Sequence, residues 1–222
     1  MNIIDSDKIN SKQPNQEKIW DSISKPWKNY VIKEIPIVVD FLKNKKGKII
    51  DFGCGTGRNM LSKDLEYYCV DFSKGQLIHC KRNAKQRKIK AEFFKQDISK
   101  LDKKIFKNKM FDYGLFISTL HCIEDNKKRL SSLKEFYRIL KPKSLALISV
   151  WNSKDKRFKN KSKNIYLPWM ENQKPFLRYY HLYEKKELIN ILKKIGFKIE
   201  KIYKSREHDR FSKKNLIILV RK

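Results

Sequence analysis

Short apolar runs alternate with amphipathic segments along most of the chain. The runs are rich in β-branched and aromatic residues, as are strands that are buried on both faces of a sheet. Seven runs are expected to be strands: residues 48–52, 67–71, 91–95, 112–118, 145–151, 197–203 and 216–220. Because helical patterns separate most of them, their order predicts an α/β fold with a mostly parallel sheet.

The segments between the runs place apolar residues at helical spacing. Leu188, Ile191, Leu192 and Ile195 recur on one side of such a segment, and Gly196 follows where a helix end favours glycine. Helices are expected over residues 75–88, 126–140 and 184–195, with two more over 16–42 that break near Pro26 and Pro36.

Two segments depart from this regular order. Residues 152–181 interrupt it after the fifth strand, with six basic residues among the ten from 154 to 163 and aromatic residues after them. We interpret this segment as an insertion loop that is mobile at its basic end. Residues 1–14 are polar and are expected to be a flexible tail, which leaves residues 15–222 as a single domain.

The sequence carries a large excess of positive charge. Lys and Arg number 53 against 24 Asp and Glu, which gives a formal net charge of +29 over 222 residues. This excess favours a polyanionic partner, and nucleic acid is the obvious one because each neutralised phosphate releases a counterion. The alternative is compositional drift towards Lys, Ile and Asn in an AT-rich genome.

Apolar run lengths and cysteine spacing exclude several classes of protein. No apolar run approaches the ~20 residues that cross a bilayer, and the first residues do not resemble a signal peptide. The four cysteines (Cys54, Cys69, Cys80 and Cys122) are scattered, with neither the spacing of metal ligands nor that of a disulfide framework. We therefore expect a cytoplasmic protein without a membrane span or a metal site.

The stretch DFGCGTG, after the first predicted strand, is the clearest candidate for a ligand site. Gly53, Gly55 and Gly57 permit a tight turn and let a ligand touch the main chain. A glycine-rich turn between a strand and a helix is typical of nucleotide cofactors. The GxGxG spacing differs from the dinucleotide fingerprint and from the phosphate-binding loop. A carboxylate at Asp51 repels a pyrophosphate and suits a ligand with an ammonium group.

Two further acids follow the next two predicted strands. Asp71 comes twenty residues after Asp51, the usual separation for a carboxylate that binds ribose hydroxyls. Asp97 follows the third strand, where an acid can accept a hydrogen bond from an adenine amino group. Because the carboxyl ends of parallel strands share one edge of a sheet, we expect the three acids to line one crevice.

The motifs DFGCGTG, CVDFS, QDIS and FDYGLFISTLHCIED resemble, in this order, those of class I S-adenosylmethionine-dependent methyltransferases. The resemblance implies a Rossmann-like sheet of seven strands, the last antiparallel, with helices on both faces. It also implies S-adenosylmethionine as the cofactor. The expected contacts are Asp51, Gly53, Cys54, Gly55 and Gly57 for the methionine part, Asp71 for the ribose, and Asp97 with Ile98 for the adenine, with Phe72 and Ser118 completing the set. One departure, LKPKS at residues 140–144, alters a turn outside this set.

The flanking segments narrow the resemblance. EKIWDSISKPWKNY and FLRYYHLYEKKEL are similar to the tRNA methyltransferases that esterify carboxymethyluridine at the anticodon wobble position. This similarity implies tRNA as the substrate and a small zinc-binding protein as an activating partner. Two alternatives stay open: a methyltransferase for a quinone or lipid precursor, and a non-catalytic RNA-binding subunit with the same fold. The net charge disfavours the first, and the intact acids disfavour the second.

Four residues are candidates for contacting the substrate. Arg178 can bind a carboxylate or phosphate with two parallel hydrogen bonds. His121 follows the fourth predicted strand, and Tyr179 and His181 lie beside Arg178 in the sequence. Packing in the core or exposure on the surface is the alternative for each of them. A carboxylate nucleophile is ionised at pH 7 and needs no base, which agrees with the lack of an obvious base dyad in the sequence.

Overall fold

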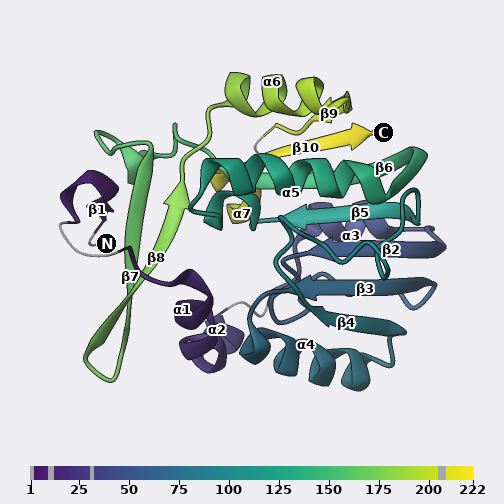
Figure 1. Ribbon diagram of the computed structural model, residues 1–222, viewed down its shortest axis with the longest axis horizontal. Helices are drawn as coiled ribbons and strands as arrows, with labels where there is room; N and C mark the ends of the chain where they lie inside the picture. Colours follow the sequence, from purple (N-terminus) through teal and green to yellow (C-terminus); the bar gives the residue numbers. More distant parts are fainter. Residues whose placement is uncertain (1–2, 10–12, 31–32, 205–208) are drawn as a thin grey trace.

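A seven-stranded sheet forms the centre of the protein. The computed structural model describes residues 3–9, 13–30, 33–204 and 209–222. The strand order is β4-β3-β2-β5-β6-β10-β9 (Figure 1), with β2 to β6 parallel and β10 antiparallel to both of its neighbours. The predicted fold class is confirmed. The strands are β2 (Gly47–Phe52), β3 (Leu65–Asp71), β4 (Ala91–Lys95), β5 (Phe111–Ile117), β6 (Leu140–Trp151), β9 (Lys198–Ile202) and β10 (Asn215–Arg221).

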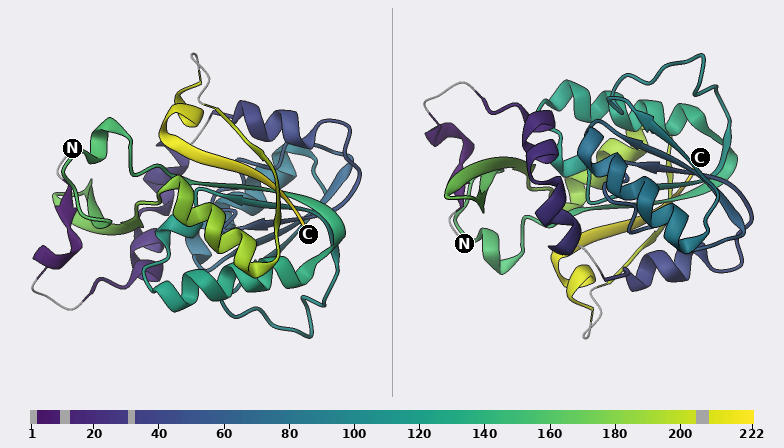
Figure 2. Two further views of the ribbon diagram at one scale, coloured as in Figure 1. Left: turned by 90° about the horizontal axis from the view of Figure 1, so that it is seen from above. Right: turned by 90° about the horizontal axis from the view of Figure 1, so that it is seen from below.

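Helices cover both faces of this sheet (Figure 2). One face packs against α5 (Asn126–Ile139) and α6 (Lys185–Ile195) through residues such as Leu133 and Leu188. The other face packs against α3 (Pro36–Leu42) and α4 (Lys74–Arg87), and the short helix α7 (Arg210–Lys214) precedes β10. Because both faces are covered, the central strands are mostly apolar, and this made them recognisable in the sequence.

The segment predicted as an insertion loop is instead a β-hairpin, so that prediction was wrong. Strands β7 (Asn164–Glu171) and β8 (Lys174–His181) pair antiparallel, after a short 3₁₀ helix, η3 (Lys156–Phe158). Within the segment predicted as a tail, β1 (Ile4–Asp5) pairs with β7, and a second 3₁₀ turn, η1 (Ser6–Lys8), follows it. These three strands form a separate small sheet beside the carboxyl edge of the large one (Figure 1).

The N-terminal region contains three helices rather than the two predicted. α1 (Gln16–Ser22) and α2 (Ser24–Tyr30) meet at Ile23, and α3 begins at Pro36. Pro26 does not interrupt α2, because it lies in the first turn of that helix, where the backbone N–H has no partner within the helix. Among the described residues, no helix is both long and apolar enough to span a bilayer.

Candidate active site

The main cavity lies at the carboxyl edge of the large sheet. It has a volume of about 860 Å³ and is bordered by the residues that follow β2, β3, β4 and β5, together with α1 and α2. Eight of the ten predicted cofactor residues border it, and Asp51 and Gly57 do not; the eight are Gly53, Cys54, Gly55, Asp71, Phe72, Asp97, Ile98 and Ser118. The structure therefore brings together segments that are far apart in the sequence, as the strand order required.

The glycine loop is a tight turn held on β3. The amides of Gly53 and Cys54 both donate to the carbonyl of Val70, at 2.8 and 3.1 Å. Gly53, Gly55 and Gly57 all have positive φ, a conformation that residues with a side chain rarely adopt. A Cβ added at Gly55 has only the Gln76 side chain within 4 Å, at 3.9 Å, so it would project into the cavity. Glycine there leaves space for a ligand against the main chain.

Asp71 connects the loop to the start of α4. Its Oδ2 accepts a hydrogen bond from the Gly55 amide at 2.9 Å, and its Oδ1 accepts one from the Ser73 amide at 2.9 Å. Burial raises the pKa of Asp71 to about 6, although these two bonds oppose the shift. Each oxygen keeps a second lone pair, so the carboxylate can accept further hydrogen bonds from a ligand hydroxyl.

Polar groups without partners surround the loop. Within the described part of the chain, hydrogen-bond partners are lacking for Oδ1 of Asp51 and of Asn59, Nε of Arg58, and both amide atoms of Gln76. Three of these residues, Arg58, Asn59 and Gln76, border the cavity. Buried polar atoms are normally paired, so this cluster indicates a polar ligand that carries both charges. The sequence analysis missed these three residues, although two of them directly follow the glycines in GTGRN.

Asp97 lies at the far end of the same cavity. Its Oδ1 accepts two hydrogen bonds from Ser99, and its Oδ2 pairs with the Lys128 ammonium at 2.9 Å. Partial burial raises its pKa, but the Ser99 hydrogen bonds and Lys128 outweigh that effect, and the pKa lies below its ordinary value. Asp97 is therefore a permanent acceptor, beside the apolar surface of Ile98.

Helix α1 covers the cavity and is fixed there by a few polar contacts. Asp21 accepts hydrogen bonds from the Ser73 hydroxyl at 2.6 Å and from the Gly75 amide at 2.9 Å. Glu17 pairs with Lys95 at 2.7 Å. Trp20, on the same helix, and Trp27, on α2, border the cavity. The N-terminal helices thus complete the site.

Arg178 lies beside the two tryptophans that border the cavity, Trp20 and Trp27. Its guanidinium carbon lies 5.2 Å from the ring centroids of Trp27 and Trp169, 5.6 Å from that of Tyr180 and 5.9 Å from that of Trp20. The residue is 6% exposed. No described carboxylate forms an ion pair with it, and its Nε lacks a hydrogen-bond partner. Arg178 does not border the cavity itself, but Trp20 and Trp27 do.

The alternation of β8 separates Arg178 from two other substrate candidates. Arg178 and Tyr180 face the tryptophans, and Tyr179 and His181 face the opposite side. Asn164 Oδ1 accepts a hydrogen bond from the Tyr179 hydroxyl at 2.6 Å and lies 2.7 Å from Nδ1 of His181. Burial lowers the pKa of His181 to about 4, so its imidazole is neutral at pH 7. Arg129 on α5 donates to the Tyr179 hydroxyl at 3.2 Å, and Nε2 of His181 lies 3.2 Å from Oε1 of Glu187 on α6, so both side chains connect the hairpin to the helices beside it.

His121 is buried between aromatic rings. It lies in the 3₁₀ turn η2 (Leu120–Cys122), stacked on Trp151 at 5.1 Å and Tyr180 at 5.7 Å. Its Nδ1 accepts a hydrogen bond from the Trp151 amide at 3.4 Å. Burial lowers its pKa to about 3, so the ring is uncharged at pH 7. The ring does not border the cavity; it packs against Trp151 and Tyr180.

The family of the chain follows from its sequence. A family model described as a methyltransferase domain matches residues 43–196, which is more than half of the chain. The chain belongs to this family. It is 26% identical over 206 residues to the tRNA (carboxymethyluridine(34)-5-O)-methyltransferase of Schizosaccharomyces pombe, covering 81% of this chain and 86% of that protein.

The chain is also similar in sequence to part of a longer protein and in fold to a solved structure. The chain is 30% identical over 149 residues to the tRNA (carboxymethyluridine(34)-5-O)-methyltransferase alkbh8 of Xenopus tropicalis, covering 66% of this chain but 22% of that protein. Its fold resembles that of the Burkholderia thailandensis 1,6-didemethyltoxoflavin-N1-methyltransferase with bound S-adenosylhomocysteine. The TM-score is 0.70, the identity is 16%, and the match covers 96% and 93% of the two chains.

This methyltransferase uses S-adenosylmethionine, and the residues of its cavity fit that cofactor. The open side of the glycine loop and the unpaired atoms of Asn59 and Gln76 suit an amino-acid group. We propose that Asp71 binds the ribose hydroxyls and that Asp97 accepts a hydrogen bond from the adenine amino group. Asp51 is fully buried, contacts Asn59 at 3.3 Å and does not border the cavity, so we propose that it acts on the ligand through Asn59.

We expect Asp51 to make the ligand-free methyltransferase less stable as the pH rises. Burial and the neighbouring Cys80 raise its pKa to about 8, so between about pH 4 and pH 8 the folded state binds more protons than the unfolded state. The free energy of unfolding contributed by this group therefore falls across that window. Asp51→Asn should gain up to about 2 kcal/mol relative to wild type between pH 6 and pH 9. Chemical denaturation of both proteins at the two pH values measures this gain; an unchanged difference would contradict it.

Proposed function

We propose that this methyltransferase acts on tRNA and esterifies the carboxylate of a carboxymethyluridine at the anticodon wobble position. The observation that carries the proposal is the buried Arg178 guanidinium beside the cofactor cavity, which has no ion-pair partner among the described carboxylates and whose Nε lacks a hydrogen-bond partner. The names of the relatives and the positive charge of the chain support tRNA as the carrier of that carboxylate.

A buried guanidinium without an anionic partner is costly. Four aromatic rings stabilise its charge in part, through cation–π contacts, but they accept no hydrogen bonds in the plane of the group. A carboxylate would accept two parallel hydrogen bonds from the N–H groups in the plane of the guanidinium. Arg178 contacts Trp20 and Trp27, which border the cavity, so we propose that movement of the Trp27 ring would open a path to it.

The residues around the cavity have a limited chemical task in this reaction. When bound, the cofactor supplies a methyl group that is already activated by a sulfonium sulfur. Asp71, Asp97 and the glycine loop would hold the cofactor, whose methyl group would be available to the carboxylate oxygen. Arg178 holds the carboxylate and orients one oxygen, and the tryptophans exclude water. No base is needed, because the carboxylate is ionised at pH 7. The neutral imidazoles of His121 and His181 are consistent with such a reaction.

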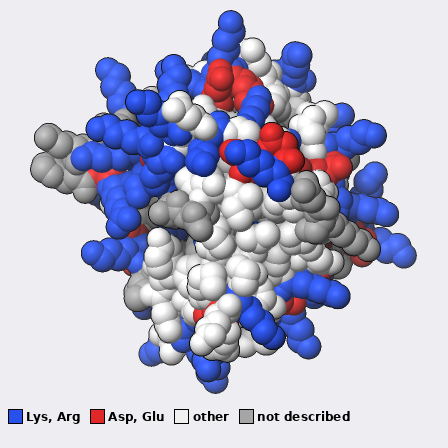
Figure 3. Space-filling model, turned by 90° about the vertical axis from the view of Figure 1, so that its left-hand side faces the viewer, with Lys and Arg blue, Asp and Glu red and all other residues white. Residues whose placement is uncertain are grey.

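The surface around this region suits an anionic polymer. On the side that carries the small sheet, Lys and Arg side chains surround a central uncharged area, and acidic groups are fewer (Figure 3). Phosphates can contact such a basic rim while an unpaired base lies against the uncharged centre. A small zinc-binding activator stays an expectation from the resemblance.

Methylation of defined tRNAs tests the proposal. One tRNA carries carboxymethyluridine at the wobble position, and its control carries the uncharged amide of the same group. With labelled cofactor, we expect label in the first tRNA alone, at one nucleoside. The label should be released as methanol by mild alkali, because a methyl ester hydrolyses while N-methyl and O-methyl ethers do not.

Other outcomes separate the alternatives. Alkali-stable label at another nucleoside would contradict the formation of a methyl ester, but it would still show that the protein methylates tRNA. Absence of label from every tRNA, with or without a partner protein, would contradict the tRNA substrate. Cofactor binding is measured in the same preparation as a control, because it shows that a negative result does not come from inactive protein.

A further inference from the structure

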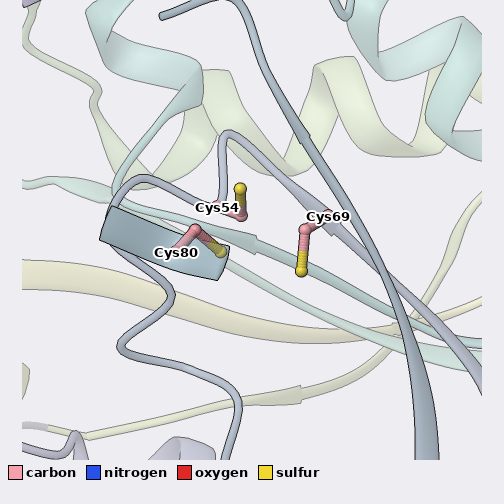
Figure 4. Close-up of side chains that lie close together, drawn as sticks. All are labelled: Cys54, Cys69 and Cys80. Carbon is pink, nitrogen blue, oxygen red and sulfur yellow. The ribbon is translucent and has the colours of Figure 1, made fainter. Parts of the chain in front are cut away.

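Three cysteines that are scattered in the sequence meet beneath the glycine loop. Cys54 lies in the loop, Cys69 on β3 and Cys80 on α4 (Figure 4). Their sulfur atoms all lie within 4.8 Å of one another. All three residues are buried and form no disulfide. The sulfur of Met60 lies 3.6 Å from that of Cys69, which adds a thioether to the cluster.

The spacing of these sulfurs matches a trigonal metal site. A metal–sulfur bond of about 2.3 Å in a trigonal plane separates the sulfurs by about 4 Å. The three thiols therefore need only a small contraction around an ion, and side-chain rotation supplies such a movement. The fourth cysteine, Cys122, lies elsewhere, with its thiol 3.5 Å from the carbonyl of Ser118.

The donor atoms decide which ion fits. Thiolates and thioethers select soft ions, and a thioether is a ligand for monovalent copper rather than for zinc. Structural zinc takes four thiolate, imidazole or carboxylate ligands in a tetrahedron, and this cluster offers three thiols and one thioether. We propose that Cys54, Cys69 and Cys80, with Met60 alongside, form a binding site for one monovalent copper ion. Each thiol that binds the ion releases its proton to solvent, and no oxidation or reduction takes place.

The site shares a wall with the cofactor cavity. Cys54 borders the cavity, whereas Cys69 and Cys80 have no exposed surface. An ion therefore reaches the cluster through the cavity and past Cys54. A bound cofactor covers this path, so we expect S-adenosylhomocysteine to slow uptake of the ion. This inference concerns the three thiols and does not depend on the identity of the methyl acceptor.

Anaerobic titration with monovalent copper against a colorimetric copper chelator tests the site. We expect one ion per chain in the wild-type protein. Cys69→Ser and Cys80→Ser should each weaken binding by about 100-fold, while Cys122→Ser should change it by less than about threefold. Circular dichroism and S-adenosylhomocysteine binding check that each variant is folded, and Cys69→Ala and Cys80→Ala serve as variants without a buried hydroxyl.

Three results would overturn the proposal. The first is no stoichiometric copper in folded wild-type protein. The second is an equal loss of affinity in Cys122→Ser, since this indicates binding to any thiol. The third is tighter binding of zinc than of monovalent copper with the same dependence on Cys69 and Cys80. Uptake that is equally fast with and without saturating S-adenosylhomocysteine would overturn the proposed path through the cavity.

Discussion

Replacing Arg178 by methionine should abolish methyl transfer to tRNA without unfolding the protein. Turnover should fall by at least about 100-fold, because truncating one partner of a buried charge pair costs several kcal/mol. Thermal stability should stay equal or rise, because the change removes a buried charge that has no ion-pair partner in the described part of the chain and keeps an apolar chain among the four rings. The affinity for S-adenosylhomocysteine should not change. Turnover with saturating tRNA, melting temperature and calorimetry measure the three quantities.

Two further variants show whether charge or geometry matters at this position. Arg178→Lys keeps the charge but loses the planar pair of donors, so turnover should also fall. Arg157→Met is a matched control, because Arg157 also lies over aromatic rings, those of Trp151 and Phe158, but is paired with Asp155 at 3.0 Å. It should keep its turnover at saturating tRNA. Normal turnover in Arg178→Met, or a large loss of stability, would show that Arg178 is structural.

The large sheet was predictable because its physics is local. Strands covered on both faces must be apolar along their whole length, and their carboxyl ends must meet at one edge. Those two rules predict from the sequence that Asp71 and Asp97 lie with the glycine loop. The unpaired atoms of Arg58, Asn59 and Gln76 were not predictable, since a missing partner is a property of the folded surroundings.

The hairpin of β7 and β8 was missed because its turn lacks the usual signal. Two-residue turns of this kind need positive φ at both central residues, and Asn-Gly is the familiar sequence. Here the two residues are Asn172 and Gln173, with φ of 47° and 62°. The buried Arg178 also interrupts the apolar face of β8. Without a strand, Arg178, Tyr179 and His181 looked like one cluster, and only the alternation of β8 separates them.

The cysteine cluster was hidden for a related reason. Metal sites are recognised in sequences by ligands that lie close together on one loop or helix. Cys54, Cys69 and Cys80 come from a loop, a strand and a helix, and the packing of α4 on β3 brings them together. Spacing along the chain therefore gave no sign of a cluster that the tertiary structure assembles.

Replacing Asp71 by asparagine should remove cofactor binding with little effect on the fold. The carboxylate accepts from the Gly55 amide with one oxygen and from the Ser73 amide with the other. An asparagine amide keeps one acceptor and turns an NH₂ group towards the second N–H, so the loop loses a hydrogen bond and the ligand loses an acceptor. We expect affinity for S-adenosylhomocysteine to fall by at least about 100-fold by calorimetry, since hydrogen bonds to charged groups contribute about 1.5–3 kcal/mol each.

Asp97→Asn is the matched control for Asp71. Asp97 is half-buried and its charge is already balanced by Lys128, so the change should lower the affinity for S-adenosylhomocysteine by about tenfold or less. The pH dependence gives an independent check. Burial holds the pKa of Asp71 at about 6, so binding to wild-type protein should weaken below pH 6 as the carboxylate takes up a proton. Asp71→Asn should lose that dependence. Folded Asp71→Asn protein with wild-type affinity would show that the ribose lies elsewhere, and the assignment of the whole cavity to the cofactor would then be wrong.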